Sequence, residues 1–193
     1  MGCAAGFFLH EARQTGWDVE GVEVAAGMVA HAQGLGLTVY EAPFAEVELE
    51  PGSFDAITMW DYIEHSLDPA GDLRQASKLL RPGGFLLVST GDAGSVVARV
   101  SGRRWHLLTP RHHNFFFTRR SLGEGFRAAA LEVELMAYPS SLYSVYYLLY
   151  KLQTVWDSPR LERLAGRVGR TRLGNRAIPI NLRDIVTVVG RRP

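Results

Sequence analysis

The sequence predicts a single α/β domain in which a parallel sheet carries helices on both faces. Strand-like apolar segments alternate with helical segments through the first 93 residues, and this alternation favours parallel strands joined by helices. A glycine turn at residues 2–6 opens the first helix, and the acidic Glu23 follows Gly6 by seventeen residues. With 193 residues, of which 47% are apolar, one domain can bury a full core.

The first elements are short. Helices are predicted over residues 7–15 and 25–33, each followed by glycine, which commonly ends a helix. Short strands over residues 19–24 and 37–41 follow these helices. Each helix is therefore expected to connect one strand to the next.

Stronger signals mark the middle of the chain. Residues 54–60 form a predicted strand entered from the turn at 51–53. A helix over residues 69–80 has Pro69 at its start and a Pro-Gly-Gly stop after it. A strand is predicted over residues 85–90, and its apolar run at 85–88 is typical of a strand buried on both faces.

The second half is less regular. Residues 95–117 are predicted to form a helix and then a long loop, and Ser121 is expected to cap a helix that runs to about Ala130. Final strands are predicted over 132–138 and 184–189. Between them lies a predicted helical insertion at residues 139–181.

The insertion has two interpretations. Residues 142–156 are apolar or aromatic on nearly every side, and such a helix is usually buried. We therefore expect it to pack over the sheet edge as a lid. The arginines that follow, Arg160, Arg163 and Arg167, leave open a contact with a membrane surface.

Charge is divided unevenly. Residues 1–93 contain 4 Lys+Arg and 14 Asp+Glu, a net charge of −10, whereas residues 94–193 contain 17 and 6, a net charge of +11. The basic half suits an anionic partner, although its spread arginines are also typical of solvated helices. The single Cys3 excludes an internal disulfide framework and favours the cytoplasm, and no apolar run is long enough to span a bilayer.

The glycine turn and Glu23 point to a nucleoside cofactor. A tight turn lets backbone N–H groups approach a ligand, and a carboxylate at the end of the next strand can accept both ribose hydroxyls. A tight strand–helix connection or an ordinary strand-end charge would have the same residues, so neither feature decides alone.

Five motifs in order resemble class I S-adenosylmethionine-dependent methyltransferases of the type 11 and type 23 group. They are residues 2–9, Glu23, residues 52–55 with 60–65, residues 79–85, and His113 with Thr118, Ser121 and Leu122. The resemblance implies a Rossmann-like sheet, S-adenosyl-L-methionine as cofactor, a cofactor-binding half at 1–93 and an acceptor-side half at 94–193. It places the cofactor on Gly2, Cys3, Ala4, Gly6, Glu23, Val24, Phe44, Trp60 and Asp61.

The sequence differs from the family pattern at two places, and each difference predicts a structural consequence. Members usually begin with a central apolar strand that ends in an acid, whereas here Met1 directly precedes Gly2. We therefore expect an N-terminally truncated chain with a gap in its sheet. The acid that often holds the adenine amino group is replaced by the segment 42–45, so adenine is expected to rest on packing and on the Phe44 backbone N–H.

Asp61, Glu64, His65 and His113 form the main chemical constellation. Carboxylates and imidazoles together can bind a divalent cation, and a related set resembles the metal site of small-RNA 2′-O-methyltransferases. Without a metal, His65 or His113 would be the general base. In a third interpretation these residues only shape the pocket.

The prediction for function is transfer of a methyl group to an O- or N-nucleophile of a small-molecule, lipid or sugar acceptor. His65 and His113 are the predicted catalytic residues. Alternatives are a non-catalytic module of the same fold and a metal-assisted enzyme acting on RNA, although nucleic acid is not the expected partner. A dehydrogenase is disfavoured because the turn lacks a third glycine near Phe8.

Overall fold

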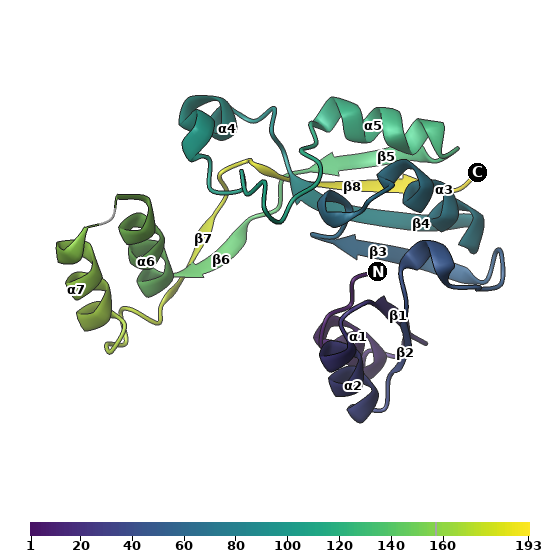
Figure 1. Ribbon diagram of the computed structural model, residues 1–193, viewed down its shortest axis with the longest axis horizontal. Helices are drawn as coiled ribbons and strands as arrows, with labels where there is room; N and C mark the ends of the chain where they lie inside the picture. The colour runs from purple at the N-terminus through teal and green to yellow at the C-terminus, as the bar shows by residue number, and fades with distance from the viewer. Residues whose placement is uncertain (157) are drawn as a thin grey trace.

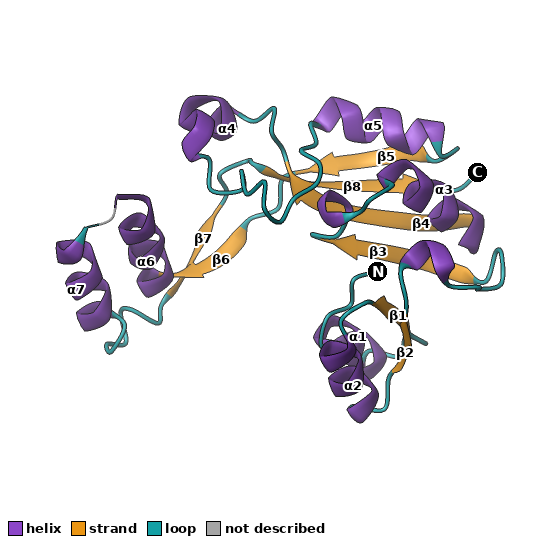
Figure 2. Ribbon diagram, viewed as in Figure 1, coloured by secondary structure: helices purple, strands orange, loops and turns teal. Residues whose placement is uncertain are grey.

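The computed structural model describes residues 1–156 and 158–193, without the side chains of 141, 151 and 154–156. Figures 1 and 2 show a mixed sheet with helices packed on it, a smaller helix–strand unit beside it, and a projecting arm. The elements are α1 (Phe7–Gln14), β1 (Glu20–Glu23), α2 (Ala26–Gly34), β2 (Thr38–Glu41), β3 (Phe54–Trp60), α3 (Pro69–Leu79), β4 (Leu80–Gly91), α4 (Val96–Ser101), α5 (Arg119–Ala128), β5 (Glu132–Ala137), β6 (Ser141–Ser144), α6 (Val145–Trp156), α7 (Pro159–Val168), β7 (Ala177–Ile180) and β8 (Ile185–Arg191).

The main sheet has the strand order β3-β4-β8-β5. β3 and β4 are parallel, as predicted, but β8 runs antiparallel to both β4 and β5. The parallel arrangement expected from the alternation of the first 93 residues therefore holds for β3 and β4, and the antiparallel strand is β8, between β4 and β5. β8 follows β5 through the insertion rather than through a crossover helix, so it can return in the opposite direction.

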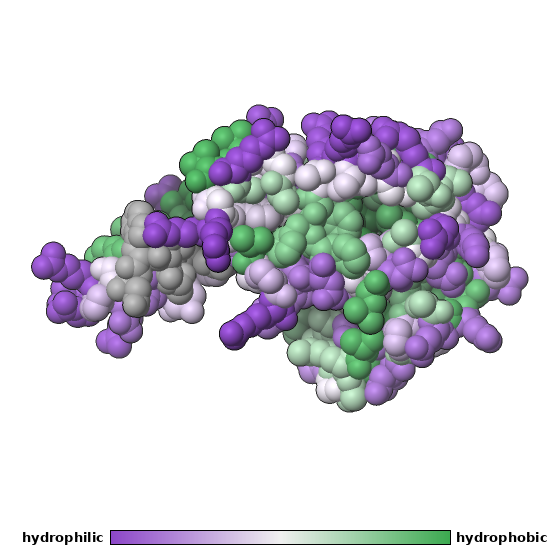
Figure 3. All heavy atoms as spheres, turned by 45° about the horizontal axis from the view of Figure 1, so that its top comes forward, coloured by the Kyte–Doolittle hydropathy of each residue, from purple (hydrophilic) through white to green (hydrophobic). Residues whose placement is uncertain are grey.

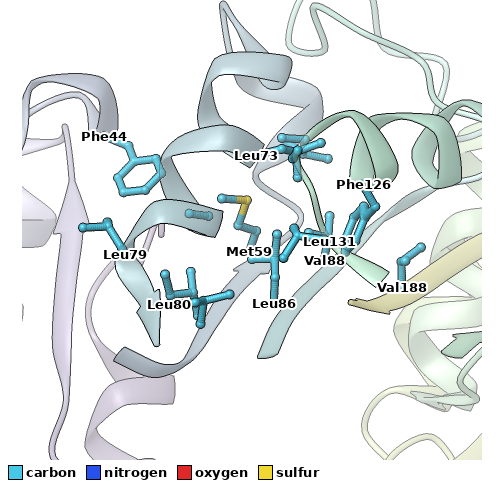
Figure 4. Close-up of a cluster of buried hydrophobic side chains, with 14 of the residues drawn as sticks. Phe44, Met59, Leu73, Leu79, Leu80, Leu86, Val88, Phe126, Leu131 and Val188 are labelled. Atoms are coloured by element: carbon cyan, nitrogen blue, oxygen red, sulfur yellow. The ribbon is translucent and has the colours of Figure 1, made fainter. Parts of the chain in front are cut away.

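α3 and α5 pack on one face of this sheet (Figure 1). Their apolar residues and the strand side chains below them form the main core, which includes the fully buried Met59, Leu86, Val88 and Phe126 (Figure 4). This core holds the carboxyl ends of β3 and β4 in place, and the loops that follow those strands carry the candidate site.

β1 and β2 form a separate parallel pair. α1 and α2 pack on it through a second cluster of Leu9, Val29, Ala32, Leu37 and Val39. A cavity of about 330 Å³ separates β1 from β3; we call it the strand gap. The first residues bridge it by hydrogen bonds: the Met1 amine donates to the Thr58 carbonyl (2.9 Å), and the Cys3 N–H donates to the Val22 carbonyl (3.2 Å).

α5 begins earlier than predicted. Its N-cap is Thr118, not Ser121, and the two residues form a reciprocal capping box: the Thr118 hydroxyl accepts from the Ser121 N–H, and the Ser121 hydroxyl accepts from the Thr118 N–H. Ser121 therefore stabilises the helix start from inside the first turn.

The insertion is not a lid. β6, α6, α7 and β7 form an arm that projects from the end of the sheet (Figure 1), and several α6 side chains, including Tyr146 and Tyr150, are exposed. Within the predicted range 139–181, residue 157 lies outside the described residues. No helix among the described residues has the length and apolar character to cross a membrane.

Candidate functional site

A cavity of about 720 Å³ opens where β1 and β3 end; we call it the loop cavity. Its walls come from the turn before α1, the end of β1, the loop after β2 and the loop after β3. Carboxyl ends of strands in an open α/β sheet are where such folds commonly bind ligands. The lining residues are Gly2, Val22, Glu23, Val24, residues 42–46, Asp61, Tyr62, residues 65–68 and Asp72.

Glu23 is held by backbone amides on one wall. Its Oε1 accepts from the N–H groups of Val24 (2.9 Å) and Ala25 (3.0 Å), and its Oε2 accepts from the Ala4 N–H (2.9 Å). The carboxylate thus ties the glycine turn to the start of α2. Each oxygen has further acceptor capacity, so a ligand hydroxyl in the cavity can bind the same group.

The glycine turn requires glycine at two positions. Gly2 (φ 57°) and Gly6 (φ 79°) both occupy the left-handed region, which other residues rarely adopt. A Cβ on Gly6 would also lie 2.7 Å from Leu37 Cδ1 and 2.8 Å from Ala32 Cβ. The turn therefore packs closely against the second cluster, and this close packing leaves no space for a side chain at Gly6.

The loop after β3 forms the opposite wall. Asp61 has a left-handed backbone (φ 47°) and accepts a hydrogen bond from the Ser89 hydroxyl at 2.9 Å. Tyr62 donates to the Asp72 carboxylate at 3.0 Å, and Ser66 donates to the same oxygen at 2.6 Å. Burial, together with Asp72, raises the pKa of Tyr62 well above its ordinary value.

Sequence reasoning missed Tyr62 and Asp72. A Cβ on Gly2 would lie 2.9 Å from the Tyr62 ring, so this ring packs directly on the glycine turn. Asp72 is inside α3 and is buried (6% exposed). Tyr62 lies within the motif at residues 60–65 but was not assigned a role there, and no local pattern marks Asp72, because their contact depends on how α3 docks on β4.

The predicted cofactor residues separate into three groups: those that line the loop cavity, those in the glycine turn, and Trp60. Gly2, Glu23, Val24, Phe44 and Asp61 line the loop cavity. Cys3, Ala4 and Gly6 form the turn without lining that cavity.

Trp60 faces the strand gap instead. There it meets Phe8 edge-to-face, with the ring centroids 5.8 Å apart. The structure therefore places Trp60 away from the other predicted cofactor residues.

Three of the four acid–histidine residues come together. Glu64, His65 and His113 each offer a ligand atom within 4.8 Å of the others, and we call them the acid–histidine cluster. The rings of His65 and His113 meet edge-to-face at 4.9 Å. Asp61 is not part of this group, although it shares the same loop.

The loop at 112–115 is fastened to the 3-10 turn Ile63–His65. The N–H groups of Asn114 (2.8 Å) and Phe115 (3.2 Å) donate to the Glu64 carbonyl, and the Asn114 side chain donates to the His65 carbonyl at 2.9 Å. These bonds bring His113 beside His65 across 48 residues of sequence.

The proton on His65 can be assigned from its partner. Its Nδ1 lies 2.7 Å from the His112 carbonyl oxygen, and because a carbonyl only accepts, Nδ1 must carry hydrogen. In the neutral ring, Nε2 is then the basic nitrogen. His65 also lines the loop cavity.

Glu64 is buried (5% exposed), and its Oε2 has no hydrogen-bond partner among the described residues. Burial raises the pKa of this carboxyl, more than its hydrogen bonds lower it. A buried carboxyl with an unsatisfied oxygen is costly. A proton on the carboxyl or a bound cation would remove this cost. For a cation, the cluster offers three ligand atoms: one carboxylate oxygen and two imidazole nitrogens.

Comparisons with known proteins agree with this architecture. Residues 1–135 match the family model of a methyltransferase domain. The chain is 35% identical over 145 residues to the ubiquinone biosynthesis O-methyltransferase of Ralstonia nicotianae, covering 68% of this chain and 61% of the relative. The corresponding enzyme of Pseudomonas aeruginosa strain UCBPP-PA14 is 33% identical over 147 residues, covering 69% and 63%.

Solved structures share the fold. A protein of Thermotoga maritima, described as a SAM-dependent methyltransferase and possible histamine N-methyltransferase, aligns with a TM-score of 0.64 at 19% identity, covering 100% of this chain and 80% of its own. A SAM-dependent methyltransferase of Archaeoglobus fulgidus gives 0.67 at 14% identity, covering 99% and 83%. The chain spans 61% and 63% of the length of the two curated relatives named above.

Proposed function

The chain belongs to the methyltransferase-domain family, and from that premise we propose that it transfers a methyl group from S-adenosyl-L-methionine to an oxygen atom of a small-molecule acceptor. One observation carries the proposal: the glycine turn, the amide-bound Glu23 and His65 all border the same loop cavity. A cofactor site and a candidate base thus share one space.

In this proposal the cofactor supplies an electrophilic methyl group when bound. Glu23 accepts hydrogen bonds from the ribose hydroxyls, and the turn from Gly2 contacts the methionine end. Tyr62, fixed by Asp72, closes the wall between them. The main contribution of the protein is to align the acceptor and exclude water.

His65 acts as the general base. The oxygen–carbon bond would form as the methyl–sulfur bond breaks and the sulfonium leaves as a neutral thioether, and the acceptor hydroxyl would lose its proton to His65 Nε2. The hydrogen bond from Nδ1 to the His112 carbonyl holds the tautomer and the orientation of the ring. His113 packs on the same ring and keeps it in place.

The acceptor is proposed to be a small hydroxylated molecule, either free or lipid-linked. The relatives support this class because they are named O-methyltransferases of ubiquinone biosynthesis. The single cysteine supports a cytoplasmic location. RNA is the less favoured acceptor, and a non-catalytic module remains the opposing hypothesis.

A second candidate mechanism is metal-assisted. The acid–histidine cluster brings three donors within 4.8 Å, and the unsatisfied Glu64 oxygen is one of them. This donor set fits a divalent transition-metal ion. Glu64, His65 and His113 would hold such an ion, and the ion would polarise the acceptor hydroxyl.

Calorimetry with S-adenosyl-L-methionine tests the proposal first, and micromolar binding is the expected result. An absence of binding to both this compound and S-adenosylhomocysteine would contradict it.

An acceptor screen with a chelator then separates the mechanisms. For a metal-free base, activity should persist in chelator and fall about 10²–10⁴-fold in His65→Ala. Loss of activity in chelator and its recovery with added metal would support the second mechanism. Unchanged turnover in the double variant His65→Ala/His113→Ala would show that neither residue takes part in catalysis.

A further inference from the structure

We propose that α4 and the described residues of the arm, 139–156 and 158–183, together form a docking surface for a bilayer with anionic headgroups. The surface lies at the end of the sheet toward which β3 and β4 point (Figure 1). The proposal deepens the proposed function by giving the source of an apolar acceptor, but bilayer binding itself requires no methyl transfer.

α4 presents apolar and basic side chains together. Val96 and Val100 are 75% and 83% exposed. Arg99, Arg103 and Arg104 surround them and are exposed as well. Figure 3 shows hydrophobic and strongly hydrophilic residues side by side where α4 lies.

The arm repeats this combination. Leu142 is 71% exposed, and the rings of Tyr146 and Tyr150 are also exposed. Tyrosine is enriched at membrane–water interfaces because its ring is apolar and its hydroxyl is polar. Along α7, Arg160 and Arg167 are exposed and lie two turns apart on one side of the helix.

Both α4 with its following loop and the arm have a positive net charge. Residues 94–111 contain four arginines and no acid, and residues 139–183 contain seven arginines and one lysine against two acids. Among the described residues, none of these arginines forms an ion pair with a carboxylate. A solvated protein surface usually mixes its charges more evenly, whereas an anionic bilayer attracts a surface with a strong excess of basic residues.

Buried hydrogen bonds fix the two parts to the same end of the sheet. The Trp105 indole N–H, just after α4, donates to Asp184 at the base of the arm (3.1 Å), and Tyr138, on the other side of that base, donates to Asp92 (2.7 Å). Trp105 and both aspartates are at most 5% exposed. α4 and the arm base are thus held as one unit and can meet one bilayer.

The combination of exposed apolar and exposed basic side chains favours a bilayer over RNA as the partner of this surface. RNA binding would use the arginines but leave the exposed Val96, Val100 and Leu142 without a role. A bilayer uses both, since apolar residues enter the acyl boundary while arginines remain at the headgroups. The same end of the molecule carries His65, so a lipid-linked acceptor would arrive beside the candidate base.

Vesicle co-sedimentation tests this surface. We expect the protein to bind vesicles of phosphatidylcholine with 30% phosphatidylglycerol, to bind pure phosphatidylcholine at least tenfold more weakly, and to be released by high salt. Arg167→Glu should weaken binding about tenfold or more, since each basic residue near the surface strengthens it by roughly fivefold. Val96→Ser with Val100→Ser should also weaken it severalfold.

Matched variants act as controls. Arg127→Glu reverses the same charge in the last turn of α5, as Arg167→Glu does in α7, and Met28→Ser removes an exposed apolar residue of α2. Both should bind vesicles like the parent.

Three results would overturn the proposal: no binding to anionic vesicles, equal losses in test and control variants, or tight binding of a single-stranded RNA oligonucleotide without vesicle binding. Cofactor calorimetry without vesicles separates these failures from failure of the proposed function.

Discussion

Replacing Glu23 tests the cofactor site most directly. In the free protein its carboxylate accepts three backbone N–H groups at 2.9–3.0 Å. Glu23→Ala removes all three, so it should loosen the turn as well as the ligand contact. Glu23→Gln is the sharper change, because its amide oxygen can still accept from Val24 and Ala25 while its NH₂ group replaces the oxygen that faces Ala4.

The expected magnitudes differ for binding and stability. Loss of charge-assisted hydrogen bonds to the ribose should cost about 2–3 kcal/mol, which corresponds to about 30- to 160-fold weaker binding. Glu23 is only partly buried, so water can replace part of its role in the free protein. The melting temperature of Glu23→Gln should therefore fall by only about 2–4 °C, equivalent to about 1 kcal/mol.

Calorimetry with S-adenosylhomocysteine and thermal unfolding of the same samples provide the two measurements. A large loss of affinity with a small loss of stability supports the assignment. Parent-like affinity of Glu23→Gln would refute it, and equal affinity in Glu23→Ala would exclude the ribose contact altogether.

The remaining predictions concern stability. Because burial raises the folded-state pKa of Glu64, the folded state binds more protons, and stability should fall as pH rises from the unfolded pKa of about 4.3 through the folded one. Glu64→Gln should remove this fall, so its melting temperature relative to the parent should be higher at pH 8 than at pH 4; the opposite order would show that the ionised carboxylate is stabilised, for example by a cation. Gly190→Ala should destabilise by about 1–3 kcal/mol, because its Cβ would lie 2.7 Å from Phe126 Cε1, and denaturant unfolding would show this. Gly27→Ala in α2 meets no atom within 4 Å and should stabilise by about 0.5–1 kcal/mol; a loss of stability there would mean that α2 packs more closely than the structure indicates.

Local signals predicted most of the fold correctly. The strand at 54–60 and the helix that begins at Pro69 match β3 and α3, because apolar patterning and proline act within a few residues. The direction of β8 was not predictable in this way. An antiparallel strand and a parallel one can have the same apolar pattern, and only pairing with β4 and β5 distinguishes them.

The insertion shows a different limit. Its aromatic sequence indicated burial, yet α6 packs on α7 and β6 within a projecting arm. Apolar composition predicts that a surface is buried, but it does not predict which element packs against that surface. The base of the arm is held by a buried hydrogen bond from Trp105 to Asp184, and no local pattern specifies this contact between residues distant in sequence.

The sequence by itself determined the parts of the site that depend on spacing along the chain: the glycine turn, Glu23 at the end of β1, and the Glu64-His65 pair after β3. The sequence also grouped His113 with that pair, as the structure confirms. Only the tertiary structure decided that Asp61 lies outside the cluster, that Trp60 faces the strand gap, and that Tyr62 and Asp72 close the loop cavity. The physical reason is that turns and strand ends are local, whereas these contacts depend on how α3 and the loop at 112–115 dock on the sheet. Docking depends on core packing between distant segments, which no single stretch of sequence specifies.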